Sequence, residues 1–214
     1  MNKKIFALAV PFLFCFALNL AAESRFALAD GAGALYVADA NNTGAGGYLQ
    51  LSKYNTRGKL LWGTDYTHEA GLQLTDVVVT PGGISLLLER RVDSRPAFTV
   101  LTYSGEGQLL WEQTYADAFP NVPVALAVDP EGNTFICGNV KYGRNYMVKV
   151  WKYDPRGGLV WSSEYSVLGN AYAKQLQTLF DGSVAVGATV FYGNSAGLYE
   201  SVSVIFNRNG ARIL

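Results

Sequence analysis

The sequence predicts an all-β fold built from four copies of one repeat, each contributing four short antiparallel strands. Three observations support this prediction. The 214 residues include 23 glycines and 13 tyrosines but only 2 methionines, a composition typical of strands joined by tight turns. Glycines recur at a fixed interval in two separate series. A segment that ends in tryptophan recurs at the same interval.

The two glycine series define the repeat. The turn glycines of one series lie at intervals of 49, 50 and 53 residues, at Gly58, Gly107, Gly157 and Gly210. Those of the other series lie at intervals of 49, 50 and 50, at Gly33, Gly82, Gly132 and Gly182. Two independent series with one period indicate an internal repeat of the chain.

The first glycine series belongs to a motif, aromatic-x-x-x-Gly-x-Leu-x-Trp. Three copies span residues 53–62, 102–111 and 152–161. In each copy a tyrosine follows the tryptophan by four residues. A fourth copy runs from Phe206 to Leu214, where Leu214 takes the tryptophan position. The last repeat is therefore incomplete.

The third repeat illustrates the strand order within each copy. Its predicted strands span residues 124–128, 134–138, 146–153 and 159–165. Asp129-Pro130 and Asp154-Pro155 begin the two inner turns, where proline fixes φ and a following glycine supplies a positive φ. Four hairpin-connected strands every 50 or so residues are typical of a β-propeller blade. The blades are expected at about 23–70, 71–119, 120–169 and 170–214.

The recurring aromatic residues are expected to pack between neighbouring blades, because a single blade cannot bury both of its faces. A tryptophan at one position per blade is well suited to this packing. The set comprises Tyr54, Trp62, Tyr66, Tyr103, Trp111, Tyr115, Tyr153, Trp161 and Tyr165.

These motifs resemble known families. Gly-x-Leu-x-Trp after an aromatic residue resembles the tryptophan-docking repeats of quinoprotein-type (PQQ-like) propellers. Asp-Pro-x-Gly-Asn and Lys-Tyr-Asp-Pro-x-Gly resemble the repeats of bacterial SBBP-type propellers. The resemblance implies a propeller fold and does not specify a function. Those families usually have more than four blades. The chain is therefore expected to close as a four-bladed propeller, to form an open arc completed by a homodimer, or to be a truncated fragment of a larger propeller.

Residues 1–22 have the layout of a secretory signal peptide: Lys3 and Lys4, a long apolar run, and Ala21-Ala22 before Glu23. The mature protein is then expected in the periplasm, at the outer membrane or outside the cell, without a membrane span. Cys15 would leave with the signal. The remaining Cys137 lies in an apolar strand and is expected to be buried and inert.

No catalytic constellation is found in the sequence. His68 is the only histidine, and the usual hydrolase, nucleotide-binding and calcium motifs are missing. Asp129, Asp154 and Asp181 precede turn glycines, where they stabilise turns. We therefore expect no metal, no cofactor and no enzymatic activity. The formal charge of zero gives no reason to expect nucleic-acid binding.

The longer loops between the second and third strands of each blade are expected to share one face, because strand direction alternates. Such loops commonly carry binding residues. Cations next to aromatic rings suit an anionic or sugar-like partner. The candidate residues are Arg90, Arg91, Arg95, Lys141, Tyr142, Arg144, Tyr146 and Tyr192, with Tyr199 nearby. The sequence thus predicts an exported binding or scaffold module for a protein or glycan. The alternatives are a truncated propeller fragment and an enzyme with a site on this face.

Overall fold

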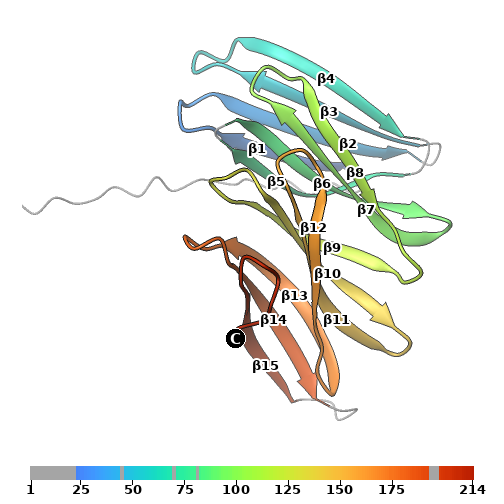
Figure 1. Cartoon of the computed structure of the whole chain (residues 1–214). Helices are drawn as coiled ribbons and strands as arrows, with labels where there is room; N and C mark the ends of the chain where they lie inside the picture. Colours follow the sequence, from blue (N-terminus) through green and yellow to red (C-terminus); the bar gives the residue numbers. More distant parts are fainter. Residues whose placement is uncertain (1–22, 44–45, 69–70, 81, 193–197) are drawn as a thin grey trace, which may run out of the picture.

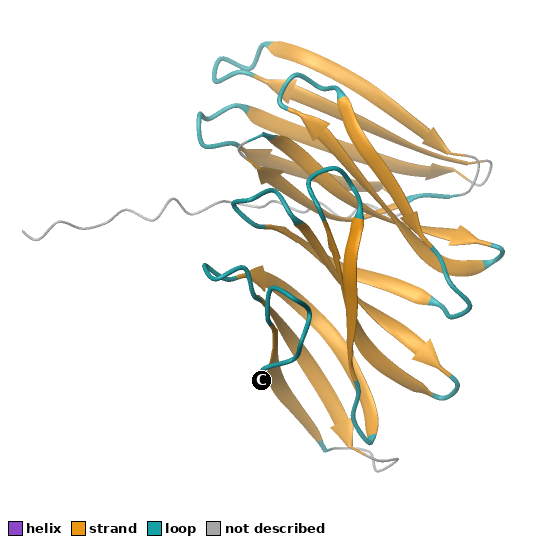
Figure 2. Ribbon diagram, in the orientation of Figure 1, coloured by secondary structure: helices purple, strands orange, loops and turns teal. Residues whose placement is uncertain are grey.

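The computed structural model describes residues 23–43, 46–68, 71–80, 82–192 and 198–214. In these residues it contains fifteen β-strands and no helix (Figure 1 and Figure 2). The predicted signal peptide lies outside the described residues. Within the described part, no helix has the length and apolar character that crossing a membrane requires.

The strands form four antiparallel sheets, each made from one repeat and paired in sequence order. The first sheet contains β1 (Glu23–Ala29), β2 (Leu35–Thr43), β3 (Gly46–Tyr54) and β4 (Leu60–His68). The second contains β5 (Gln73–Thr80), β6 (Gly83–Val92), β7 (Arg95–Ser104) and β8 (Leu109–Tyr115). The third contains β9 (Asn121–Val128), β10 (Thr134–Tyr142), β11 (Asn145–Tyr153) and β12 (Leu159–Tyr165). The fourth contains β13 (Gly169–Thr178), β14 (Val184–Tyr192) and β15 (Tyr199–Phe206).

The inner turns form for the reason that the sequence suggests. In the turn between β11 and β12, the Asp154 carboxylate accepts hydrogen bonds from the backbone N–H groups of Arg156 (2.8 Å) and Gly158 (2.9 Å). Gly157 completes the turn with φ +83°, a conformation that costs glycine little. Asn55 and Asn207 make the same pair of bonds in the equivalent turns.

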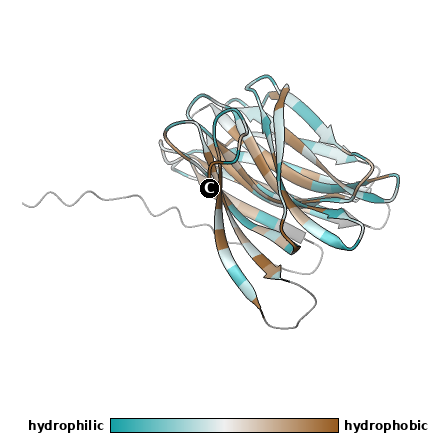
Figure 3. Cartoon of the chain, turned by 60° about the horizontal axis from the view of Figure 1, so that its bottom comes forward, coloured by the Kyte–Doolittle hydropathy of each residue, from teal (hydrophilic) through white to brown (hydrophobic). Residues whose placement is uncertain are grey.

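The four sheets pack face to face in an open arc, with the first and fourth sheets at opposite ends (Figure 1). Buried apolar side chains fill each of the three interfaces between neighbouring sheets, and apolar bands follow the strands inside the stack (Figure 3). The structure is propeller-like, but its sheets do not close into a ring. The expected closed four-bladed propeller is therefore not confirmed.

Each motif tryptophan lies against the turn of the next sheet. A Cβ atom on Gly107 would approach the Trp62 ring to 2.7 Å, and one on Gly157 would approach the Trp111 ring to 2.9 Å. Gly210 has the same relation to Trp161, at 2.8 Å. Such close contact leaves no room for a side chain at these turns, so glycine is required both by φ and by the tryptophan.

The fourth sheet is incomplete, as the sequence predicts. It has three strands instead of four. Where the other sheets have an outer strand, residues after β15 make only a short pairing: the N–H of Ile213 donates to the carbonyl of Ile205 (2.8 Å), and the N–H of Ile205 donates to that of Leu214 (3.0 Å).

Candidate ligand-binding surface on the fourth sheet

Three of the four arginines of the predicted loop face are engaged with the protein itself. Arg90 lies between the first and second sheets, where its Nη1 atom donates to the hydroxyls of Thr99 (3.4 Å) and Thr114 (3.3 Å). Arg91 donates to the carbonyl of Ser94 and Arg95 to that of Ala118, each at 3.0 Å. Arg90 is therefore half-buried near the tip of the β6–β7 hairpin and bonded to its own sheet.

Tyr142 belongs to a polar network between the second and third sheets. Its hydroxyl donates to Glu164 (3.0 Å), and the ammonium group of the buried Lys149 lies 3.2 Å from the same carboxylate oxygen. Asp117 and Tyr115 complete the network, at 3.8 and 3.3 Å from the Lys149 nitrogen. Burial alone would lower the pKa of Lys149, but its bonds with Tyr115 and Glu164 outweigh burial and raise it. Lys149 thus stays protonated and ties the two sheets together.

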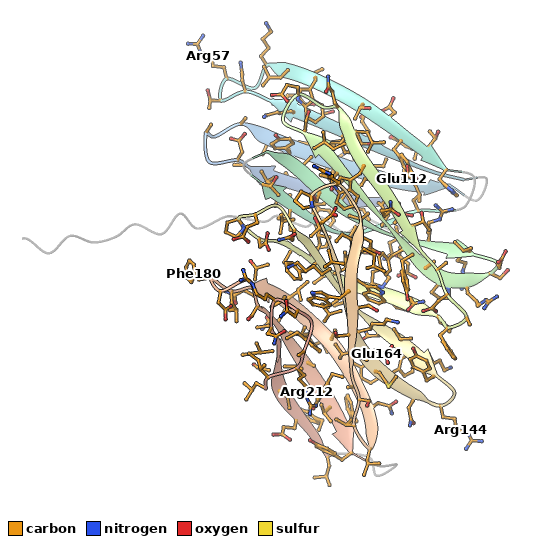
Figure 4. All side chains as sticks on the ribbon, viewed as in Figure 1. Arg57, Glu112, Arg144, Glu164, Phe180 and Arg212 are labelled. Atoms are coloured by element: carbon orange, nitrogen blue, oxygen red, sulfur yellow. The ribbon has the colours of Figure 1, made fainter. Side chains whose placement is uncertain are left out.

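The other candidates divide between exposed and packed positions. Arg144 is exposed and points away from the sheets at the tip of the β10–β11 hairpin (Figure 4). Tyr192 is also exposed, and its hydroxyl donates to Glu200 (3.1 Å). Lys141 and Tyr146 lie together, with the ammonium group 5.7 Å from the ring centroid. Of these four residues, the structure brings Lys141 and Tyr146 into contact, whereas Arg144 and Tyr192 lie on different hairpins, β10–β11 and β14–β15.

Lys141 and Tyr146 begin a row of aromatic rings that crosses from the third sheet to the fourth. The ring centroids of Tyr146 and Tyr172 are 5.0 Å apart, those of Tyr172 and Phe191 are 5.8 Å apart, and those of Phe191 and Tyr199 are 6.0 Å apart. The last two side chains are 40% and 69% exposed. Because large exposed aromatic groups commonly mark binding surfaces, this row is a candidate site.

The row continues onto the face of the fourth sheet that points away from the third. Val186, Val190 and Val204 pack toward the third sheet, and side chains alternate along a strand. Gly187 and Ser203, which are paired across β14 and β15, therefore lie on the opposite face. This outward face has no neighbouring sheet among the described residues.

The outward face differs chemically from the equivalent faces of the other sheets. The register position of Ser203 is held in the first three sheets by buried Leu51, Val100 and Val150. The position of Ser201 is likewise held by Leu49, Phe98 and Val148. On the fourth sheet, two apolar core positions have therefore become exposed serines.

A shallow pocket of about 300 Å³ lies on this face. Polar groups dominate its lining, which includes Lys174, Gln175, Gly187, Thr189, Ser201 and Ser203. Lys174 is the extra residue of a β-bulge in β13, and Thr75 and Val124 are the extra residues of the bulges in β5 and β9. Bulges redirect side chains and are frequent beside functional sites. Of these three bulges, only the one in the fourth sheet has a charged extra residue.

Lys141, Tyr146 and Tyr199 of this surface were predicted from the sequence, whereas Tyr172, Phe191, Gln175 and the remaining residues were not. The signal was present in the aligned repeats, where serine replaces an apolar residue at fixed positions. The face could not be recognised without the strand register, because register decides which side of the sheet each residue occupies.

Two titratable side chains outside this surface, Asp76 and Cys137, have raised pKa values because they are buried. Burial raises the pKa of the Asp76 carboxyl, although its oxygens accept hydrogen bonds from the backbone N–H groups of Leu126 and Val77 (each 2.8 Å). The Cys137 thiol is fully buried, and burial raises its pKa to about 12, which makes it a poor nucleophile. Among the described residues, no group of three or more His, Cys, Asp and Glu side chains could hold a metal ion.

No protein-family model and no curated protein sequence matches the chain. Among solved structures, an apocarotenoid oxygenase from Synechocystis is similar with 9% identity and a TM-score of 0.49, over 84% of this chain and 45% of the oxygenase. The chain thus spans less than half of that protein. A GH43 endo-arabinanase from Bacillus licheniformis is similar with 14% identity and a TM-score of 0.42, over 87% of this chain and 74% of the arabinanase.

The comparisons correct one expectation. The sequence predicted a protein without enzymatic activity, whereas the oxygenase and the arabinanase are both enzymes. The expectation of a non-enzyme is therefore contradicted. At these identities and TM-scores the likeness says nothing about a reaction or substrate, and resemblance to PQQ-like or SBBP-type repeats in particular is not established by it.

Proposed function

We propose that this chain is an exported binding module of β-propeller type, and that the outward face of its fourth sheet binds an acidic polysaccharide. The exchange of apolar core residues for Ser201 and Ser203 carries the proposal. These positions are buried and apolar wherever a neighbouring sheet covers them. On the fourth sheet they offer hydroxyl groups to a ligand rather than packing surface to a protein.

The chemistry of the surface suits a sugar chain. Hydroxyl and amide groups of Ser201, Ser203 and Gln175 can each donate and accept hydrogen bonds, as the hydroxyl groups of a sugar require. Beside them, the exposed rings of Phe191 and Tyr199 offer flat apolar surface, which suits the C–H faces of a pyranose. A protein partner remains the alternative ligand, but it would favour a larger apolar patch.

The charge of the surface favours an acidic polymer. Lys174 is the only charged residue among the described residues that line the pocket, and Lys141 stands at the start of the aromatic row. A polymer of uronic acids has both the sugar faces and the carboxylates that this combination would recognise.

Affinity electrophoresis in gels that contain polygalacturonate tests the proposal, with neutral arabinan as the comparison polymer. We expect polygalacturonate to retard the protein more than arabinan. Tyr199→Ala and Lys174→Gln should each weaken binding about tenfold, which corresponds to roughly 1.4 kcal/mol. Both side chains are exposed, so the unfolding midpoint should remain unchanged.

Tyr48→Ala is the matched control, because Tyr48 is a 39% exposed tyrosine on the first sheet, at the other end of the arc. Binding should survive this substitution. Equal effects of Tyr48→Ala and Tyr199→Ala, or no retardation by polygalacturonate, would overturn the proposal.

A further inference from the structure

A second pocket lies between the second and third sheets, beside the inner turns that join their strands. Its volume is about 280 Å³. It is separate from the face of the fourth sheet and shares no residue with it. The floor includes Ser85 and Thr102, whose hydroxyl oxygens are 3.0 Å apart.

The repeat shows what occupies the same place at the other two interfaces. Ser85 and Thr102 are a cross-strand pair, and the equivalent pairs are Tyr36 with Lys53 and Phe135 with Lys152. Each of these lysines lies over its paired ring, with its nitrogen 4.6 Å from the Tyr36 centroid and 5.1 Å from the Phe135 centroid. An alkylammonium group therefore fills this position at both neighbouring interfaces.

The Lys53 ammonium group shows which contacts the position offers. It donates to the carbonyl of Gly105, in a turn of the second sheet, at 3.2 Å and lies 3.5 Å from the Asp30 carboxylate. The first interface is also hollowed at this end, but there Lys53 and Asp30 are part of the lining. At the second interface the small Ser85 and Thr102 leave the position without an ammonium group.

The charges around the second-interface pocket are of one sign. Its described lining contains the carboxylates of Asp129 and Glu131 and no lysine or arginine. Both Asp129 oxygens already accept hydrogen bonds from Asn133, at 2.8 Å each, whereas Glu131 is exposed at the turn. Apolar groups of Val128, Pro130 and Trp111 complete the walls. A pocket with apolar walls, hydroxyl groups and carboxylates that no lysine or arginine of the lining balances favours a small organic cation.

We propose that the pocket between the second and third sheets binds a small primary alkylammonium compound. The ligand places its chain along the apolar walls and its ammonium group by the Ser85 and Thr102 hydroxyls. It thus supplies from solution the group that Lys53 and Lys152 supply at the neighbouring interfaces. This site is independent of the polysaccharide proposed for the fourth sheet.

Titration with n-butylammonium, followed by the backbone amide NMR signals of the full mature chain, tests the inference. The probe has the length of a lysine side chain. We expect saturable shifts at Ser85, Thr102 and the turn around Glu131. We expect shifts about tenfold smaller, or none, with the uncharged 1-butanol at the same concentration.

Two variants locate the site. Thr102→Lys combined with Ser85→Phe reproduces the residues of the third sheet and fills the pocket with the protein's own ammonium group, so binding should be lost. Glu131→Gln removes one exposed charge without disturbing the core, and binding should weaken severalfold. Because Glu131 lies in a turn, this variant remains informative if the double variant fails to fold.

Three results would overturn the inference. They are the absence of saturable shifts with n-butylammonium, equal shifts with 1-butanol, and unchanged binding in a folded double variant or in Glu131→Gln. Lys174→Gln serves as the control, since it should leave butylammonium binding intact whether or not the fourth sheet binds polysaccharide.

Discussion

Trp111→Ala probes the contact on which the arc depends. The Trp111 side chain is 8% exposed and lies between the second sheet and the Gly157 turn of the third. Burial of about 200 Å² of ring surface contributes about 5 kcal/mol at 25 cal/mol per Å². Measured truncations of buried aromatic residues cost about 3–5 kcal/mol. We therefore expect the free energy of unfolding to fall by about 3–5 kcal/mol.

The assay is equilibrium unfolding in urea, followed by far-UV circular dichroism and tryptophan fluorescence. Leu110→Ala is the control, because Leu110 precedes Trp111 in β8 and is 56% exposed; it should cost less than about 0.5 kcal/mol. A loss below about 1 kcal/mol for Trp111→Ala would refute the claim that the tryptophan holds the two sheets together.

A double-mutant cycle with Gly157→Ala sharpens the test. The added Cβ would lie 2.9 Å from the Trp111 ring and on a residue with φ +83°. In the wild-type background the substitution brings both the clash and the left-handed backbone cost, which is about 1–2 kcal/mol. In the Trp111→Ala background only the backbone cost should remain. Additive effects would show that the ring and the turn are not in contact.

Two further predictions concern stability. Asp93 and Ser94 form a hairpin turn with φ of 49° and 64°, so Ser94→Gly should raise the free energy of unfolding by about 1 kcal/mol in urea; a loss of stability would contradict the turn geometry. Burial opposes ionisation of Asp117, but its bonds with Asn121, the Phe119 N–H and Tyr115 outweigh burial and lower the pKa below 3.8. The ionised Asp117 carboxylate therefore contributes its full stabilisation above about pH 3.8, the ordinary pKa of an aspartate. This stabilisation is lost as the pH falls through the lowered pKa of the folded protein. Asp117→Asn should therefore be less stable than wild type at pH 7, and the gap should shrink toward pH 2 in thermal unfolding scans; a gap independent of pH would exclude this role.

The repeat period carried most of the information about the fold. The predicted strand 159–165 coincides with β12, and 146–153 differs from β11 by one residue. The predicted strand 134–138 stopped short of β10, which continues to Tyr142. Polar residues after Gly138 suggested a loop, but pairing of Tyr142 with Asn145 extends the hairpin to its tip. Cross-strand pairing overrides local composition here.

The arrangement of the sheets and the binding surface were harder to predict. Closure depends on the angle between neighbouring sheets, which repeat length does not fix. The face polarity was readable only with the register. The polarity of the two end faces also matters for the predicted homodimer. On the outward face of the first sheet, Asp39 and Ser52 occupy the positions that buried Leu88 and Leu101 occupy in the second sheet. Both end faces thus carry polar residues at positions that are apolar inside the arc, and the homodimer stays a prediction.

The stacking of successive sheets has a consequence for cooperativity. The substantial contacts between sheets join neighbours only: β5 contacts β1 and β2, β9 contacts β5 to β7, and β13 contacts β9 to β11. The free energy of such a chain approximates a sum of per-unit and nearest-neighbour terms, as in a one-dimensional Ising model. Denaturation can then begin at an end, and the three-stranded fourth unit, joined through a single interface, is the one expected to unfold first.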